Sequence, residues 1–158
     1  MDRKIFFNRY FFVIILLGCG ALVSSFIVAE GLQRSPCLFC KLQRIPFALM
    51  SVNAVFGLIG PYKGGFFKVI LAFLGLGALL GMVHFLMQMG MVPDFCSSQR
   101  GFNSPEEFLN TLQSPQCSKV SWSVGGIPVS LFNAMLHGIT LGVSIRLKTK
   151  KKLIRNVI

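Results

Sequence analysis

Long apolar runs restrict this chain more than any other feature. Residues 10–29 contain no charged side chain, and a helix of this length rises about 30 Å, the thickness of a bilayer's hydrocarbon core. With 53% hydrophobic and 13% charged residues, the chain is too apolar for an ordinary soluble protein. We expect an all-α membrane protein, a single integral-membrane domain over residues 1–158. Its four transmembrane helices are predicted at about residues 10–29, 42–60, 66–89 and 127–145, followed by a basic tail at 146–158.

The first apolar run is preceded by basic residues, as the core of a signal peptide would be. It is long for such a core, however, and Glu30-Gly31-Leu32-Gln33-Arg34 is a poor cleavage site. We therefore expect no removed segment.

The basic residues predict the orientation of the helices. Most of the 16 lysines and arginines lie in the amino-terminal arm, the short second loop and the tail: Arg3, Lys4, Arg9, Lys63, Lys68, Arg146, Lys148, Lys150, Lys151, Lys152 and Arg155. Because basic residues in short loops stay on the cytoplasmic side, we expect both termini in the cytoplasm and the other two loops outside. The same topology, at an anionic membrane surface, accounts for the net charge of +11, so we expect the lipid bilayer and no nucleic acid as a partner.

Four of the five cysteines form two pairs, one in each extracytoplasmic loop. Cys37 and Cys40 lie in a Cys-Leu-Phe-Cys tetrad, and Cys96 and Cys117 bracket a later polar loop. Both pairs would face the oxidising side, where disulfides form and persist. Two cysteines that lie close in the sequence switch easily between dithiol and disulfide. The pattern therefore predicts thiol–disulfide exchange that passes electrons to a component of the bilayer. Cys19, in the middle of the first span, is expected to be a buried packing residue.

The residues around the first pair suggest a ligand site at the membrane surface. Ser35-Pro36 predicts a helix start, which would put both cysteines in the first turns, where the helix dipole favours a thiolate. Arg44 would share a face with Cys40 and could stabilise its thiolate or bind a ligand's carbonyl oxygen. Pro46 predicts a kink or a second helix start near Arg44.

Two histidines lie inside predicted spans. His84 is expected near the outer surface, where it would contact a carrier bound beside Arg44; a structural hydrogen bond between helices is the alternative. His137 is interpreted as a packing residue.

The third loop carries several local signals. Ser104-Pro105-Glu106-Glu107 predicts a helix over about residues 105–113, which would either lie on the membrane surface or simply order the loop. Trp122 suits an interfacial anchor, Gly125-Gly126 a turn, and Pro128 the start of the fourth helix.

Two other interpretations of the cysteines stay open. A four-cysteine zinc site would need Cys96 and Cys117, which lie far apart for a metal-binding pair. A non-enzymatic membrane protein could instead use two structural disulfides to staple its loops.

The joint pattern resembles the DsbB family, disulfide bond formation protein B. Pro36-Cys37-Leu38-Phe39-Cys40 with Gln43-Arg44 is similar to the family's signature. The later Cys96, Cys117, Trp122 and Gly126-Ile127-Pro128 are similar in order and setting, so that the resemblance covers essentially the whole chain.

The resemblance implies a quinone-dependent thiol oxidase in the bacterial plasma membrane (inner membrane), with its active loops facing the periplasm. Its partner would be a DsbA-like thioredoxin-fold protein that gives disulfides to secreted proteins, and its cofactor ubiquinone or menaquinone. A quinone reductase of the vitamin-K-epoxide-reductase type is a related alternative, although that family usually keeps its Cys-x-x-Cys on a late helix.

Residue by residue, the resemblance implies catalytic roles for all four paired cysteines. The partner would attack Cys96 and release Cys117, and exchange with the first pair would pass two electrons inward. Cys40 would then face the quinone, with Arg44 and His84 as the residues that bind it.

Overall fold

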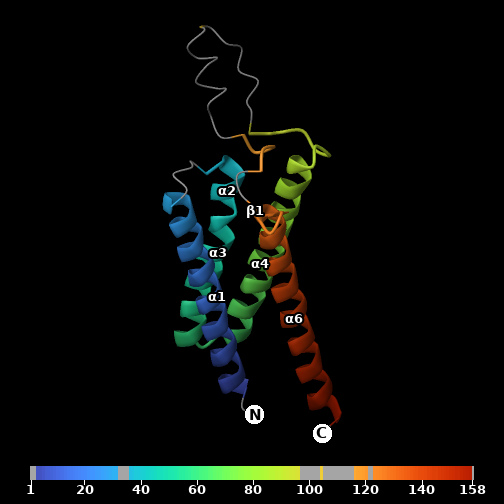
Figure 1. Cartoon of the computed structure of the whole chain (residues 1–158). Helices are drawn as coiled ribbons and strands as arrows, with labels where there is room; N and C mark the ends of the chain where they lie inside the picture. The colour runs from blue at the N-terminus through green and yellow to red at the C-terminus, as the bar shows by residue number, and fades with distance from the viewer. Residues whose placement is uncertain (1–2, 32–35, 97–103, 105–115, 121–122, 158) are drawn as a thin grey trace.

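The described part of the chain folds into a bundle of long helices with one short β-hairpin. The computed structural model describes residues 3–31, 36–96, 104, 116–120 and 123–157. Its elements are α1 (Arg3–Gly31), α2 (Leu38–Leu42), α3 (Arg44–Ile59), α4 (Lys63–Gln88), β1 (Ser123–Val124), β2 (Ile127–Pro128) and α6 (Val129–Val157). The long helices stand side by side, α1 begins at the same end of the bundle where α6 ends, and α2 lies at the opposite end (Figure 1).

Three helical segments within the described residues are long and apolar enough to cross a membrane: Lys4–Gly31, Leu38–Ile59 and Lys63–Gln88. The fourth helix, α6, is present, but Asn133 and His137 lower the hydropathy of its apolar half. Its membrane crossing stays a prediction.

The helix boundaries differ from the predicted ones mainly at their polar ends. α1 begins at Arg3 and α6 runs on to Val157, because Lys and Arg are good helix formers and the helix continues beyond the apolar run. The second helix start near Arg44 is confirmed, since α2 ends at Leu42 and α3 begins at Arg44.

The helix start expected at Ser35-Pro36 is wrong. α2 begins at Leu38, because Cys37 is extended (φ −61°, ψ 166°) and acts as the N-cap. The sulfur of Cys37 accepts a hydrogen bond from the backbone N–H of Cys40 at 3.2 Å. Ser35 lies outside the described residues.

Each helix packs on its neighbours in the order α1, α3, α4, α6. Small residues let the backbones approach: a Cβ built on Gly81 of α4 would lie 2.7 Å from the backbone nitrogen of Ala134 in α6. At the end of the bundle where α1 begins, the Tyr10 hydroxyl and the Ser144 Oγ of α6 lie 3.0 Å apart. Lys63 Nζ donates to Asn8 Oδ1 at 2.8 Å at the same end.

Two further expectations have clear outcomes. Cys19 is exposed on the surface of the bundle, so its assignment as a buried residue is wrong: α1 buries its other faces against α3. Gly125 and Gly126 do form a turn, with φ of +59° and +81°, and it joins β1 to β2 in a two-residue hairpin. Pro128 ends β2, and α6 begins one residue later. The helix predicted at 105–113 and Trp122 lie outside the described residues.

Candidate functional site

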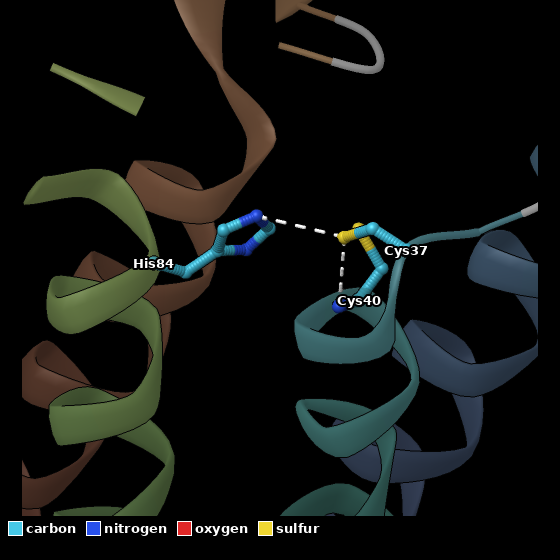
Figure 2. Close-up of side chains that lie close together, drawn as sticks. All are labelled: Cys37, Cys40 and His84. Carbon is cyan, nitrogen blue, oxygen red and sulfur yellow. Dashed lines mark hydrogen bonds between the residues drawn. The ribbon is translucent and has the colours of Figure 1, made fainter. Parts of the chain in front are cut away.

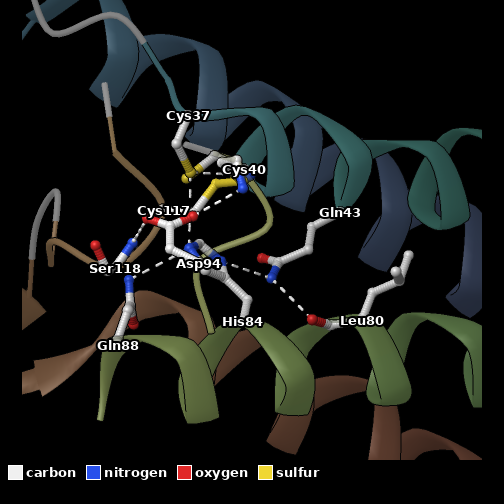
Figure 3. Close-up of a disulfide and its surroundings, with 10 residues drawn as sticks. Cys37, Cys40, Gln43, Leu80, His84, Gln88, Asp94, Cys117 and Ser118 are labelled. Atoms are coloured by element: carbon white, nitrogen blue, oxygen red, sulfur yellow. Dashed lines mark hydrogen bonds between the residues drawn. A yellow bond between two sulfur atoms is a disulfide. The ribbon is translucent and has the colours of Figure 1, made fainter. Parts of the chain in front are cut away.

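The two cysteine pairs meet at the end of the bundle opposite the termini. Cys37 and Cys117 are 1% and 0% exposed and share one apolar cluster with Met87 of α4. Cys40 and Cys96 lie at the edge of the same cluster. Residues far apart in the sequence are thereby brought into one site, as Figure 3 shows.

The second pair is a disulfide that a carboxylate holds from both sides. Cys96 and Cys117 are bonded, with their Cα atoms 5.8 Å apart. Asp94 accepts hydrogen bonds from the backbone N–H of Cys96 at 2.8 Å and of Ser118 at 2.9 Å (Figure 3). Asp94 is not among the site residues predicted from the sequence. The available signal was an Asp two residues before a loop cysteine, a position from which Asp side chains accept backbone N–H bonds.

The cysteines of the first pair are not joined by a disulfide and lie in unequal surroundings. The sulfur of Cys37 is buried and lies 3.6 Å from His84 Nε2 (Figure 2). The Cys40 side chain and burial raise the pKa of the Cys37 thiol, whereas the contact with His84 acts in the opposite direction. Cys40 is only partly buried and lines a cavity. One thiol therefore faces the disulfide region and the other faces the cavity.

His84 of α4 lies between the side chains of Gln43 and Gln88, of which Gln88 is one turn later in the same helix. Gln43, between α2 and α3, donates from Nε2 to His84 Nδ1 at 2.9 Å and to the Leu80 carbonyl at 3.4 Å. Gln88 Nε2 lies 3.4 Å from His84 Nε2, and the Ser130 hydroxyl of α6 donates to Gln88 Oε1. The hydrogen bond from Gln43 fixes the ring beside the Cys37 sulfur.

A cavity of about 320 Å³ lies beside this cluster, between α1, α3, α4 and α6. Its volume falls within the range of small-molecule sites, about 300 to 1,000 Å³. The polar residues along its wall include Cys40, Gln43, Arg44, His84, Gln88, Ser130 and Asn133. The three residues expected near a bound carrier, Cys40, Arg44 and His84, thus share one cavity.

Arg44 has a buried hydrogen-bond donor that is not used within the described part of the chain. Its Nη2 donates to the Ser25 carbonyl at 3.4 Å, and its guanidinium carbon lies 4.5 Å from the centre of the Phe26 ring. Within the described part of the chain, its buried Nε has no hydrogen-bond partner, and neither amide atom of Asn133 has one. An apolar ring that carries carbonyl oxygens would satisfy the two donors among these groups, Arg44 Nε and Asn133 Nδ2.

The four-cysteine zinc site is contradicted. Zinc binds thiolates, and the sulfurs of Cys96 and Cys117 are bonded to each other. Ligand atoms of Cys37, Cys40 and His84 do lie within 4.8 Å of one another, but all three belong to the redox cluster described above.

Comparison with known proteins gives one result. A family model described as "Disulfide bond formation protein DsbB" matches residues 8–147, most of the chain. No curated protein and no solved structure matches the chain.

Proposed function

Because the chain belongs to the DsbB family of disulfide bond formation membrane proteins, we propose that it is a quinone-dependent thiol oxidase. It reoxidises a DsbA-like thioredoxin-fold protein and passes the electrons to a membrane quinone, ubiquinone or menaquinone. The observation that carries the proposal is the position of a dithiol between a half-buried disulfide and a cavity among the helices.

The disulfide Cys96–Cys117 receives the electrons of the partner. A partner thiolate attacks the Cys96 sulfur, a mixed disulfide forms, and Cys117 leaves as a thiolate. The second partner thiol then attacks the mixed disulfide. The partner departs with its own disulfide closed, and Cys96 and Cys117 are left as two thiols.

The first pair then accepts the same two electrons. With Cys37 and Cys40 joined in a disulfide, a thiolate of the second pair attacks the Cys37 sulfur, which shares the apolar cluster with Cys117. Cys40 is the leaving thiolate, and it lines the cavity. A second exchange closes Cys96–Cys117 again and leaves Cys37 and Cys40 as a dithiol, the state in which the structure describes them.

A quinone supplies a two-electron, two-proton acceptor. The residues of the cavity fit it, because Arg44 offers an unpartnered donor for a carbonyl oxygen and the wall beside Cys40 is largely apolar. His84 Nδ1 accepts from Gln43, so Nε2 carries the hydrogen of the neutral ring and stabilises a thiolate at Cys37. As the bond between Cys37 and Cys40 forms, the dithiol loses two electrons and two protons, and quinone becomes quinol.

The proposed setting is the bacterial inner membrane, with both termini in the cytoplasm and both cysteine pairs on the periplasmic side. Support comes from the basic residues near both ends of the chain and from the position of α2 at the opposite end of the bundle (Figure 1).

The test is a reconstituted reaction. Purified protein is mixed with a reduced thioredoxin-fold dithiol protein and ubiquinone, and quinone absorbance is followed. We expect loss of quinone with the native protein and none with Cys40→Ser. If the two disulfides were purely structural, the native protein would not consume quinone, and that result would contradict the proposal. In Cys117→Ser, a mixed disulfide between the partner and Cys96 should accumulate.

A further inference from the structure

Asn133 of α6 is a buried polar residue that the thiol chemistry leaves unexplained. Its side chain is 8% exposed, and neither its Nδ2 nor its Oδ1 has a hydrogen-bond partner among the described residues. An unpaired amide buried in a helix bundle costs free energy, since neither water nor lipid compensates for it. A ligand that hydrogen-bonds to the amide would remove this cost. Asn133 lines the cavity that Cys40 and Arg44 also line.

The position of Asn133 relative to Arg44 follows from a ring contact between His137 of α6 and Phe47 of α3. His137, one turn after Asn133, packs its ring against Phe47 with the ring centres 4.2 Å apart, and Phe47 lies one turn after Arg44. His137 also donates from Nδ1 to the Asn133 carbonyl at 3.0 Å. This contact joins α6 to α3, so Asn133 and Arg44 each lie one turn from it, on facing helices and in one cavity.

We infer that Asn133 is a second hydrogen-bonding contact for the quinone, on the wall opposite Arg44. The ligand class is a quinone whose two carbonyl oxygens lie on opposite sides of the ring, and the inference rests on the proposed function. The Asn amide turns about a torsion with broad energy wells, so a small rotation directs it toward a ligand.

The amide group suits a ligand that changes its hydrogen-bonding character during the reaction. A quinone carbonyl only accepts, and Asn133 Nδ2 donates to it. A quinol hydroxyl donates, and Asn133 Oδ1 accepts from it. Arg44 only donates, so of these two residues only Asn133 can accept from the hydroxyl group of the reduced form.

The test uses Asn133→Leu, which keeps the branched shape and the number of side-chain heavy atoms and removes the amide. Binding of a short-chain ubiquinone and of its quinol to detergent-purified protein is measured by equilibrium dialysis with extraction of the bound ligand. We expect both dissociation constants to rise roughly three- to tenfold, the effect of one neutral hydrogen bond. Asn133→Gln keeps the amide and should bind more tightly than Asn133→Leu, and Met135→Ala, on the exposed side of α6, should bind like the native protein.

A second measurement separates a ligand contact from a structural role. Without quinone, Asn133→Leu should unfold at the same temperature as the native protein or higher, because it removes an unpaired buried amide; a lower temperature would overturn the inference. Unchanged binding in Asn133→Leu would also overturn it and leave the proposed function standing. Failure of the native protein to bind quinone would overturn both.

Discussion

At the scale of single residues, the two thiols of the Cys-x-x-Cys tetrad have different chemistry although they lie three positions apart. Cys37 is the N-cap of α2, and its sulfur points to His84, whereas Cys40 lies inside the helix and lines the cavity (Figure 2). Their sulfur atoms lie close together, but Cys37 is buried and Cys40 is only partly buried. The spacing pattern predicts that both are redox-active, and only the folded structure shows which thiol is buried and which lines the cavity.

This difference predicts the order of alkylation. The pKa of Cys37 is raised first by the Cys40 side chain and then by burial, so less of it is thiolate at neutral pH. In a Cys19→Ser background at pH 7, iodoacetamide should modify Cys40 first, and the rate at Cys37 should keep rising with pH above the usual thiol range. Mass spectrometry of quenched samples gives both rates. In Cys40→Ala, Cys37 should titrate at lower pH; an unchanged profile would show that burial alone sets its pKa.

Asp94 predicts the stability of the second disulfide. Its carboxylate holds the backbones of Cys96 and Ser118, and its charge lies near both sulfurs, where it disfavours the thiolates of the reduced pair. Asp94→Ala should therefore make Cys96–Cys117 easier to reduce, by about 1–3 kcal/mol. The fraction reduced is measured over a series of dithiothreitol ratios. Asp94→Asn keeps one acceptor oxygen but no charge, so its disulfide should be reduced at a ratio between those of the native protein and Asp94→Ala. Equal reduction curves for Asp94→Ala and the native protein would show that Asp94 does not stabilise the disulfide.

At the scale of helices, the contact between α4 and α6 depends on small residues in a Gly-x-x-x-Gly pattern. A Cβ on Gly77 would collide with the His137 ring, and one on Gly81 would meet the backbone of Ala134. Small residues spaced four apart let membrane helices approach closely. This contact matters for function because it holds Ser130 and Asn133 of α6 at the cavity wall.

Gly77→Ala should therefore destabilise the bundle by about 1–3 kcal/mol through overpacking. The thermal midpoint in detergent measures the change. Gly75→Ala is the matched control, since it lies in the same helix and its Cβ would meet nothing within 4 Å. If both variants unfold at the same temperature, the close approach of α4 and α6 does not limit stability.

The sequence predicts helices better than it predicts their faces. Length and hydropathy give the long spans, and Pro46 gives the break before α3. Cys19 was misplaced because α1 is apolar on all sides, so no periodicity distinguishes its packed face from its exposed one. Cys37, Cys40, Cys96 and Cys117 are recognisable from spacing. Asp94 and Asn133 are not, because their importance comes from backbone groups and a cavity that exist only in the folded bundle.

At the scale of the whole molecule, the bundle is closed at one end and open at the other. α1 and α6 meet through Tyr10 and Ser144 near the end where the chain begins. Toward the opposite end, the same two helices instead form walls of the cavity, with the cysteine cluster beside it. In the proposed orientation, a lipid-soluble ligand would reach the thiols from within the bilayer, and a soluble protein would reach the loops from outside.

That arrangement requires a defined orientation, and a membrane-impermeant maleimide tests it on whole cells. Single cysteines are placed at exposed positions of a cysteine-free chain: Ser123→Cys in β1, Tyr62→Cys between α3 and α4, and Lys150→Cys in α6. Because basic residues remain in the cytoplasm, Ser123→Cys should react in intact cells and the other two only after lysis. The result at Lys150 decides whether α6 crosses the membrane: reaction there in intact cells would leave α6 outside. In that case only three helices would span the bilayer, and α6 could not wall a cavity open to membrane quinone.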